Sequence, residues 1–155
     1  MGFRNQAARP DLDEQDLKIL QQLSQDAKTS YVQLGQLVGL TGPAVHGRVR
    51  KMEKGGVIRR YGIEVDYSVI GLPVTAFVRV QTGKTSCRDA GRLVSKYEEV
   101  IECHTVAGED DLLLKTRTAT PLDLQNLLDK LKTEGLIEKS ISVFVLETQF
   151  ERVRI

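Results

Sequence analysis

The sequence predicts an α+β protein in two parts. An N-terminal helix-turn-helix (winged-helix-like) domain is expected over residues 1–66, and a C-terminal ferredoxin-like domain over residues 72–155. Three observations predict this division. Three capped helical segments precede residue 57, the hydrophobic spacing then changes from helical to alternating, and the later elements follow the order β-α-β-β-α-β. An exit strand over Val57–Val65 and a linker over residues 66–71 are expected to join the parts.

Each of the three N-terminal helices has a start signal. Asp13, Ser30 and Thr41 are residue types that cap helices, because their side-chain oxygens accept a free backbone N–H of the first turn. Pro43 suits the first turn of the third helix, and Gly39 suits the end of the second. The first helix is expected to end near residues 26–29, and the third at Gly55-Gly56. By helical spacing, the core-facing side chains are Leu17, Ile19, Leu20, Leu23, Leu34, Leu37, Val38, Val45, Val49 and Met52.

The second half alternates strands with two capped helices. Strands are expected over residues 72–81, 100–107, 112–118 and 141–149. Ser86 and Thr120 are the expected caps of the two helices, and Gly135 is expected near the end of the second. The helix stripes are Ala90, Leu93, Val94 and Tyr97, then Leu124, Leu127, Leu128 and Leu131.

One face of the predicted sheet needs a cover. Both helices pack on the same face of a ferredoxin-like sheet, which leaves the other face open. Yet Ile141 and Val143 alternate with Phe144 and Leu146, so both faces of the last strand are apolar, and the first strand adds Phe77. A second copy of the same sheet is the simplest cover, so the sequence predicts a homodimer.

Composition excludes some classes of protein. The chain has 155 residues, of which 41% are hydrophobic and 28% charged, as in ordinary globular proteins. No apolar run approaches the roughly 20 residues of a membrane helix, and residues 1–10 lack a signal-peptide core, so a cytoplasmic location is expected. Cys87 and Cys103 cannot supply a four-ligand metal cluster, and neither a metal nor a cofactor is expected.

Positive charge is concentrated around the third helix. Between residues 41 and 60 there are six basic residues and one acid, Glu53, although the net charge of the chain is only +1. If Val45, Val49 and Met52 face the core, a cationic surface faces outward, as suits a helix that enters the major groove of double-stranded DNA. Without the capped helix-turn-helix, a solvated helix face would be the better explanation of these charges. The candidate DNA-binding residues are Thr41, Pro43, His46, Arg48, Arg50, Lys51, Lys54, Arg59 and Arg60. His46 and Arg50 are expected to reach base edges, and Lys51, Lys54, Arg59 and Arg60 to contact phosphates, with Arg48 nearer the core and orienting the domain on the backbone.

From Leu12 onward the chain resembles the leucine-responsive regulator/AsnC (Lrp/AsnC) family of bacterial and archaeal transcriptional regulators. The resemblance lies in LDEQDLKILQQL, SYVQLGQLVGLTGPAVHGRVRKMEKGGVIRRY and VAGEDDLLLK. It implies DNA binding as dimers or larger even assemblies, often octamers, and a response to an amino acid held between subunits near the turn between the second and third strands. The effector-binding residues implied are Thr105, Gly108, Glu109, Asp110, Asp111 and Thr120.

The sequence departs from the family pattern at two places. Gly47 stands where similar proteins often carry a larger polar side chain, and the run Glu109-Asp110-Asp111 is more acidic than the usual turn. Two alternatives follow: a sensing and assembly module without DNA binding, or an enzyme similar to sirohaem decarboxylases, which share the two-domain arrangement. The histidines, His46 and His104, with Glu102 on the same sheet face as His104, are more typical of structural roles than of catalysis. The sequence therefore predicts a regulator and no enzymatic activity.

Overall fold

The computed structural model describes residues 11–151 and 155, which divide into two compact units. One unit is built around residues 11–64 and includes the C-terminal Ile155; the other is Val65–Phe150. The predicted linker over residues 66–71 therefore lies inside the second unit. There Tyr67 stacks under the Arg117 guanidinium at 3.6 Å, and the Leu72 N–H donates to the Tyr67 carbonyl.

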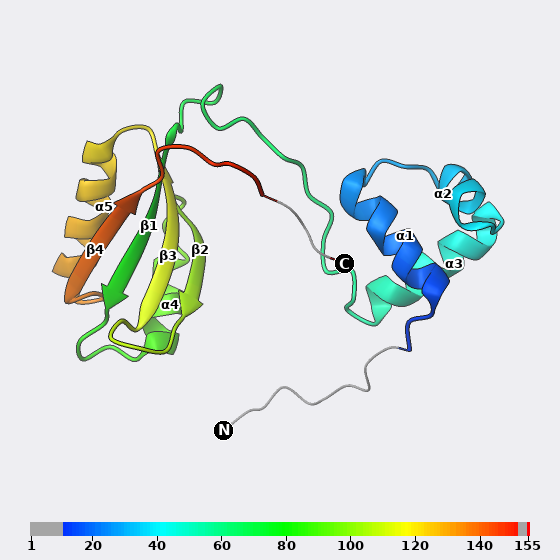
Figure 1. The fold of residues 1–155 in the computed structure, drawn as a ribbon. Helices are drawn as coiled ribbons and strands as arrows, with labels where there is room; N and C mark the ends of the chain where they lie inside the picture. Colours follow the sequence, from blue (N-terminus) through cyan, green and yellow to red (C-terminus); the bar gives the residue numbers. More distant parts are fainter. Residues whose placement is uncertain (1–10, 152–154) are drawn as a thin grey trace. The chain divides into compact units, whose positions relative to one another are not determined.

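The first unit contains three helices, α1 (Glu14–Gln25), α2 (Tyr31–Val38) and α3 (Gly42–Lys54) (Figure 1). The predicted caps are confirmed: Asp13 and Ser30 each form a reciprocal capping box, and Thr41 accepts the Ala44 N–H. Gly39 ends α2 at φ 72°, the left-handed conformation that glycine adopts without steric cost. The sequence thus predicted all three helix starts correctly.

The core of the first unit is formed by one stripe from each helix, namely Ile19, Leu34, Val38, Val45, Val49 and Met52. Two predicted core residues are wrong: Leu17 is 46% exposed and Leu37 is 61% exposed. On α1, the buried positions are Asp16 and Ile19, which turns Leu17 outward. The predicted strand Val57–Val65 is also wrong, because no strand of the described chain pairs with it.

The second unit is a four-stranded antiparallel sheet of order β2-β3-β1-β4, with helices α4 and α5 on one face (Figure 1). In chain order its elements are β1 (Val74–Gln81), α4 (Cys87–Val94), β2 (Val100–Thr105), β3 (Leu112–Thr118), α5 (Pro121–Thr133) and β4 (Lys139–Phe144). The predicted β-α-β-β-α-β order is confirmed. The last strand begins two residues earlier than predicted and ends at Phe144 rather than at residue 149.

The inner face of this sheet forms the second core. Alternate residues of β1 and β3, such as Val78 and Leu114, are buried against the apolar stripes of α4 and α5, to which Leu127 of α5 belongs. On the opposite face and along β4, large apolar side chains remain exposed: Phe77, Ile141, Val143 and Phe144, followed by Leu146, which is 99% exposed. The second unit therefore presents an uncovered apolar surface.

Candidate nucleic-acid interface and effector turn

The third helix is anchored by its inner face. Val45 and Val49 are fully buried, and Met52 nearly so, at the spacing of one helix face. Pro43 lies in the first turn, where its missing N–H costs no hydrogen bond. Gly35 of α2 packs so closely against the α2–α3 turn that a Cβ there would collide with the Leu40 carbonyl oxygen. The position of α3 is thus fixed by its core contacts and by the tight turn before it.

The outer face of α3 carries exposed basic side chains. His46, Arg50 and Lys54 are exposed and follow one another at intervals of four residues, so they form a single row along the helix. Lys51 is exposed beside this row, and an added Cβ at Gly47 would meet nothing within 4 Å. This arrangement presents donors from neighbouring turns of one helix face, which is the geometry that contact with base edges and phosphates requires.

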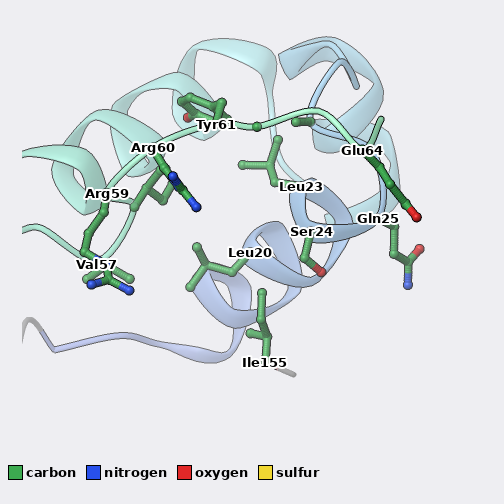
Figure 2. Close-up of a pocket in the computed structure, with 13 residues that line it drawn as sticks. Leu20, Leu23, Ser24, Gln25, Val57, Arg59, Arg60, Tyr61, Glu64 and Ile155 are labelled. Carbon is green, nitrogen blue, oxygen red and sulfur yellow. The ribbon is translucent and has the colours of Figure 1, made fainter. Parts of the chain in front are cut away.

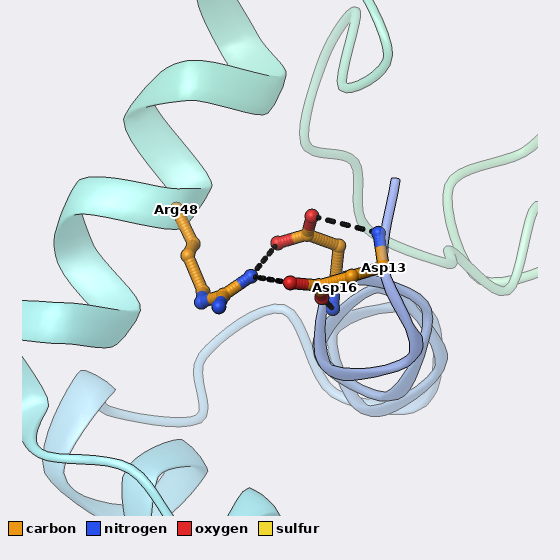
Figure 3. A network of polar contacts seen from close by, with 3 residues as sticks. All are labelled: Asp13, Asp16 and Arg48. Atoms are coloured by element: carbon orange, nitrogen blue, oxygen red, sulfur yellow. Dashed lines mark hydrogen bonds and ion pairs between the residues drawn. The ribbon is translucent and has the colours of Figure 1, made fainter. Parts of the chain in front are cut away.

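Arg48 is held away from this row. Its Nη1 donates to Asp13 Oδ2 at 2.6 Å and to Asp16 Oδ1 at 2.9 Å, and Asp16 is only 3% exposed (Figure 3). The hydrogen bond to Asp16 raises the pKa of Arg48, with a further contribution from Asp13. The pKa of Asp13 is lowered chiefly by the hydrogen bond from the Asp16 backbone N–H and next by the hydrogen bond from Arg48. Arg48 therefore ties α3 to the start of α1, and its contact with the DNA backbone stays a prediction.

Arg59 and Arg60 lie in the exposed segment that follows α3. They line a hollow of about 840 Å³, which Leu20 and Leu23 of α1 also line and which Ile155 borders (Figure 2). None of the residues that line it belongs to the exposed row of α3. Arg59 and Arg60 thus line a hollow that neither His46 nor Arg50 lines, and their contacts with DNA stay a prediction.

Two aromatic residues near α3 were not found from the sequence. The Tyr31 ring stacks on His46 with centroids 5.2 Å apart, and the Tyr61 hydroxyl donates to Glu53 at 2.9 Å. Burial raises the pKa of Tyr61 to about 12, with a contribution from the Glu53 hydrogen bond, so the phenol remains a donor. Tyr31 and Tyr61 lie in other segments from their partners, and helical spacing carries no signal for such contacts.

The turn between β2 and β3 is closed mainly by its own carboxylates. Asp111 accepts from the Thr82 N–H at 2.8 Å, and Asp110 accepts from Arg79 Nε at 2.6 Å. Gly108 has φ 140°, a conformation that side chains rarely adopt. The backbone carbonyl of Glu109 accepts a hydrogen bond from the side-chain amide of Gln81. Glu109 itself is exposed. Two of the three acidic side chains thus already have partners.

Arg79 also lines a shallow hollow beside this turn. The hollow has a volume of about 330 Å³, and its lining residues are Arg79, Gln81, Asp110, Lys132, Glu138, Lys139, Ser140 and Ile141. It combines cations, carboxylates and an apolar wall. Arg79, absent from the predicted set, is thereby a candidate effector-binding residue.

Thr105 and Thr120 lie at opposite ends of the sheet. Thr105 ends β2 and pairs with Leu112, next to the turn. Thr120 follows the other end of β3, about 20 Å away for a strand of this length. Its hydroxyl and N–H both contact Asp123 in the capping box of α5. Within one subunit Thr120 is therefore a helix cap and not a neighbour of the turn.

The remaining titratable groups form few clusters. His104 Nε2 lies 3.2 Å from Glu102 Oε2, both exposed on the open sheet face. Among residues 11–151 and 155, no group of three or more His, Cys, Asp or Glu side chains is arranged to hold a metal ion. In the same part of the chain, no helix has the length and hydrophobicity that a membrane span requires.

Comparisons with known proteins match both units. The AsnC-type helix-turn-helix domain matches residues 12–53, and the Lrp/AsnC ligand binding domain matches residues 75–155. The regulator FL11 of Pyrococcus horikoshii is 32% identical over 145 residues, covering 92% of this chain and 95% of its own. The regulator LrpB of Bacillus subtilis is 32% identical over 132 residues, covering 85% of this chain and 89% of its own.

Solved structures agree with this result. An AsnC family regulator from Agrobacterium tumefaciens has a TM-score of 0.85 at 27% identity, covering 93% of this chain and 96% of its own. A Neisseria meningitidis transcriptional regulator, solved as its L-Met complex, gives the same TM-score, identity and coverage. The capped helix-turn-helix, the sheet with helices on one face and these matches identify the chain as a member of the Lrp/AsnC family of helix-turn-helix transcriptional regulators.

Proposed function

We propose that the outer face of α3 reads the major groove of double-stranded DNA, with His46 and Arg50 at base edges and Lys51 and Lys54 at phosphates. The observation that carries this proposal is the exposed row of donors on a helix whose inner face is fully packed. Thr41 and Pro43 open this helix, where backbone N–H groups favour a phosphate. Arg59 and Arg60, which are exposed in the segment after α3, are proposed to contact phosphates as well.

The test compares charge removal on α3 with the same removal elsewhere. Arg50→Ala and Lys51→Ala are compared with Lys130→Ala, an exposed position of α5. Affinity for the DNA upstream of the protein's own gene is measured over a range of salt concentrations. Each lost phosphate contact lowers the slope of log affinity against log salt by about 0.9. The α3 variants should weaken binding at least tenfold while Lys130→Ala retains native binding; equal effects at all three positions would contradict the proposal.

The protein is proposed to act as a homodimer whose subunits join through the open face of the sheet in the second unit. Phe77, Ile141 and Val143 are the exposed apolar residues that support this assembly. A twofold arrangement places two α3 helices about one DNA turn apart, or a multiple of it, on a pseudo-palindromic site. Larger even assemblies such as octamers, which the family resemblance implies, would join such dimers.

Sedimentation measures this assembly directly. Val143→Lys places a charge in the proposed interface, whereas Val32→Lys places one on an exposed position of α2. The first variant should sediment as a monomer and the second like the native protein. A monomeric native protein, or a Val143→Lys protein that assembles normally, would contradict this arrangement.

The effector is proposed to be an amino acid bound between subunits at the β2–β3 turn. Support comes from the related regulator that was solved with L-Met, from Asp110 beside Arg79 and its hollow, and from Thr105 and Gly108 next to the same turn. A ligand at one hundred times its dissociation constant stabilises the protein that binds it by about 2.7 kcal/mol. Thermal unfolding with a panel of amino acids therefore detects the effector, and Asp110→Asn should abolish the shift while Asp89→Asn retains it.

We propose a regulatory and not an enzymatic role, in the cytoplasm, where the DNA of bacteria and archaea lies. Support comes from the named relatives, which are regulators from these organisms. A sirohaem-decarboxylase-like activity would instead require binding of a porphyrin, which intense visible absorption on titration would reveal.

A further inference from the structure

A stacked pair of rings connects the two helices of the helix-turn-helix. Tyr31 is the first residue of α2, and His46 lies in the first half of α3. Their ring centroids are 5.2 Å apart with an angle of 23° between the planes, which is within the range of attractive aromatic stacking. Tyr31 is 38% exposed, so this pair lies at the surface and is not part of the core.

The backbone on both sides of the pair is fixed. Ser30 and Gln33 close a capping box around the start of α2, which sets the position of Tyr31. On α3 the neighbouring Val45 is fully buried, which sets the position of His46. Few rotamers are open to a side chain on a helix. Contact with the Tyr31 ring therefore restricts the remaining freedom of the imidazole, which is rotation about the Cβ–Cγ bond of His46.

His46 is well placed to contact bases if α3 enters the groove. The N-terminal part of a recognition helix is the part that contacts base edges, and His46 starts the row that continues with Arg50. An imidazole ring offers a nitrogen on each side for a hydrogen bond, so its rotation decides which base edge it can pair with. A ring that is already oriented also loses less side-chain freedom on binding.

We propose that Tyr31 is a specificity-determining positioning residue, whose ring holds His46 in the orientation that reads one base pair of the operator. This inference rests on the proposed DNA-reading function of α3. In this arrangement α2 influences, through Tyr31, which base pair the residues of α3 prefer. The Tyr31 hydroxyl is not required for this role, because the stack involves only the ring.

Four variants separate the ring from other effects. Tyr31→Phe retains the ring and removes the hydroxyl, and Tyr31→Leu removes the ring. His46→Ala removes the reader itself. Leu37→Ala is the matched control, because Leu37 is an exposed apolar residue of the same helix and takes no part in the stack.

The experiment is binding to a library in which each base pair of the operator is varied. A specific base contact discriminates by about fivefold or more. His46→Ala and Tyr31→Leu should both lose at least fivefold of the preference at the same base pair, whereas Tyr31→Phe and Leu37→Ala retain it. The stack is followed independently by the ring-current shift of the His46 proton resonances, which should be present in the native protein and in Tyr31→Phe and absent in Tyr31→Leu.

The outcomes distinguish this inference from the function on which it rests. If native protein binds its operator and Tyr31→Leu keeps the full base preference, Tyr31 does not position His46 and the inference is wrong. The same holds if the ring-current shift is absent in the native protein. If the native protein binds no DNA at all, the proposed function fails first and the inference fails with it.

Discussion

Two glycines of the helix-turn-helix should respond in opposite directions to the same substitution. Gly35 and Gly47 both lie inside helices, where alanine is intrinsically favoured by about 1 kcal/mol. At Gly47 the added methyl group meets nothing within 4 Å, so Gly47→Ala should gain this amount. At Gly35 the methyl group collides with the Leu40 carbonyl oxygen and lies 3.3 Å from the Thr41 carbonyl carbon, both backbone atoms that cannot move aside like a flexible side chain.

The cost at Gly35 exceeds the gain in propensity. Overpacking in a close-packed region costs about 1–3 kcal/mol, and more when the obstacle is backbone. Relief requires a shift of the α2–α3 turn, which breaks the Leu40 N–H hydrogen bond to the Gly35 carbonyl, now 2.8 Å. For a unit of this size, 1 kcal/mol corresponds to about 4–8 °C in melting temperature. Gly47→Ala should therefore melt about 4–8 °C higher, and Gly35→Ala lower by a similar or larger amount.

Scanning calorimetry with circular dichroism at 222 nm measures both variants against the native protein. If the two units unfold in separate transitions, only the melting temperature of the first unit should change. Because the shifted turn carries α3 with it, Gly35→Ala should also bind DNA more weakly at temperatures where it is still folded. A Gly35→Ala protein that melts at or above the native temperature would refute the reasoning, as would a Gly47→Ala protein that melts lower.

Two further substitutions test the structural roles assigned to predicted site residues. Arg48→Met leaves Asp16 buried without its cation and should lower the melting temperature of the first unit at neutral pH. The Asp16 backbone N–H and, after it, Arg48 hold the pKa of Asp13 below its ordinary 3.8. The contribution of Arg48 to stability is therefore present above pH 3.8 and is lost as the pH falls through the lower folded pKa. The difference in melting temperature between the two proteins should therefore narrow in acid, and a constant difference would contradict this account. Thr120→Val removes the α5 cap and should cost about 0.5–2 kcal/mol in denaturant unfolding, while amino-acid binding stays native. Loss of ligand binding in this variant at full stability would return Thr120 to the effector site.

The helix starts were predictable because their signals are local. Asp13, Ser30, Thr41, Ser86 and Thr120 each accept a backbone N–H from within their own first turn, so a few consecutive residues contain the whole interaction. The core stripes were less certain, because which side of a helix is buried depends on its neighbours. Leu37 has the same spacing as a core residue and is exposed nevertheless.

Strand boundaries depend on the partner strand. The alternation of apolar residues continues to Leu146, but β4 ends at Phe144, which pairs with Ala76 near the start of β1. Val145 makes one more hydrogen bond, to the Thr75 carbonyl, and β1 extends only one residue further, to Val74. The predicted strand Val57–Val65 failed for the same reason, because alternation without a partner strand in the described chain produces no ladder.

Long-range contacts supply the partners of site residues that the sequence could not reveal. Arg48 lies on a helix rich in basic residues, and helical spacing predicted that it lies nearer the core and orients the domain on the DNA backbone. Its actual partners, Asp13 and Asp16, lie more than 30 positions earlier in the chain. The excess acidity of the β2–β3 turn has a similar explanation, since Asp110 pairs with Arg79 of β1 and Asp111 accepts from Thr82, the residue that follows β1.

The Arg79–Asp110 pair makes a prediction about the kind of effector. An ammonium group that takes the place of Arg79 at Asp110 Oδ2 releases a guanidinium that lines the same hollow. An amino acid satisfies both groups, because its ammonium meets Asp110 and its carboxylate meets Arg79. An amine would leave Arg79 without an anion, and a carboxylic acid would leave Asp110 without a cation; each unpaired group is costly in a partly buried site, where Asp110 is 15% exposed.

We therefore expect the proposed site to select zwitterions. L-Met, its decarboxylated amine and its deaminated acid are suitable probes in calorimetric titration, since they share one side chain. The amino acid should bind at least tenfold tighter than either analogue, and Arg79→Gln should reduce this preference over the amine while the preference over the acid persists. If the amine binds the native protein as tightly as L-Met, the effector's carboxylate does not contact Arg79, and the ion pair serves only to close the turn.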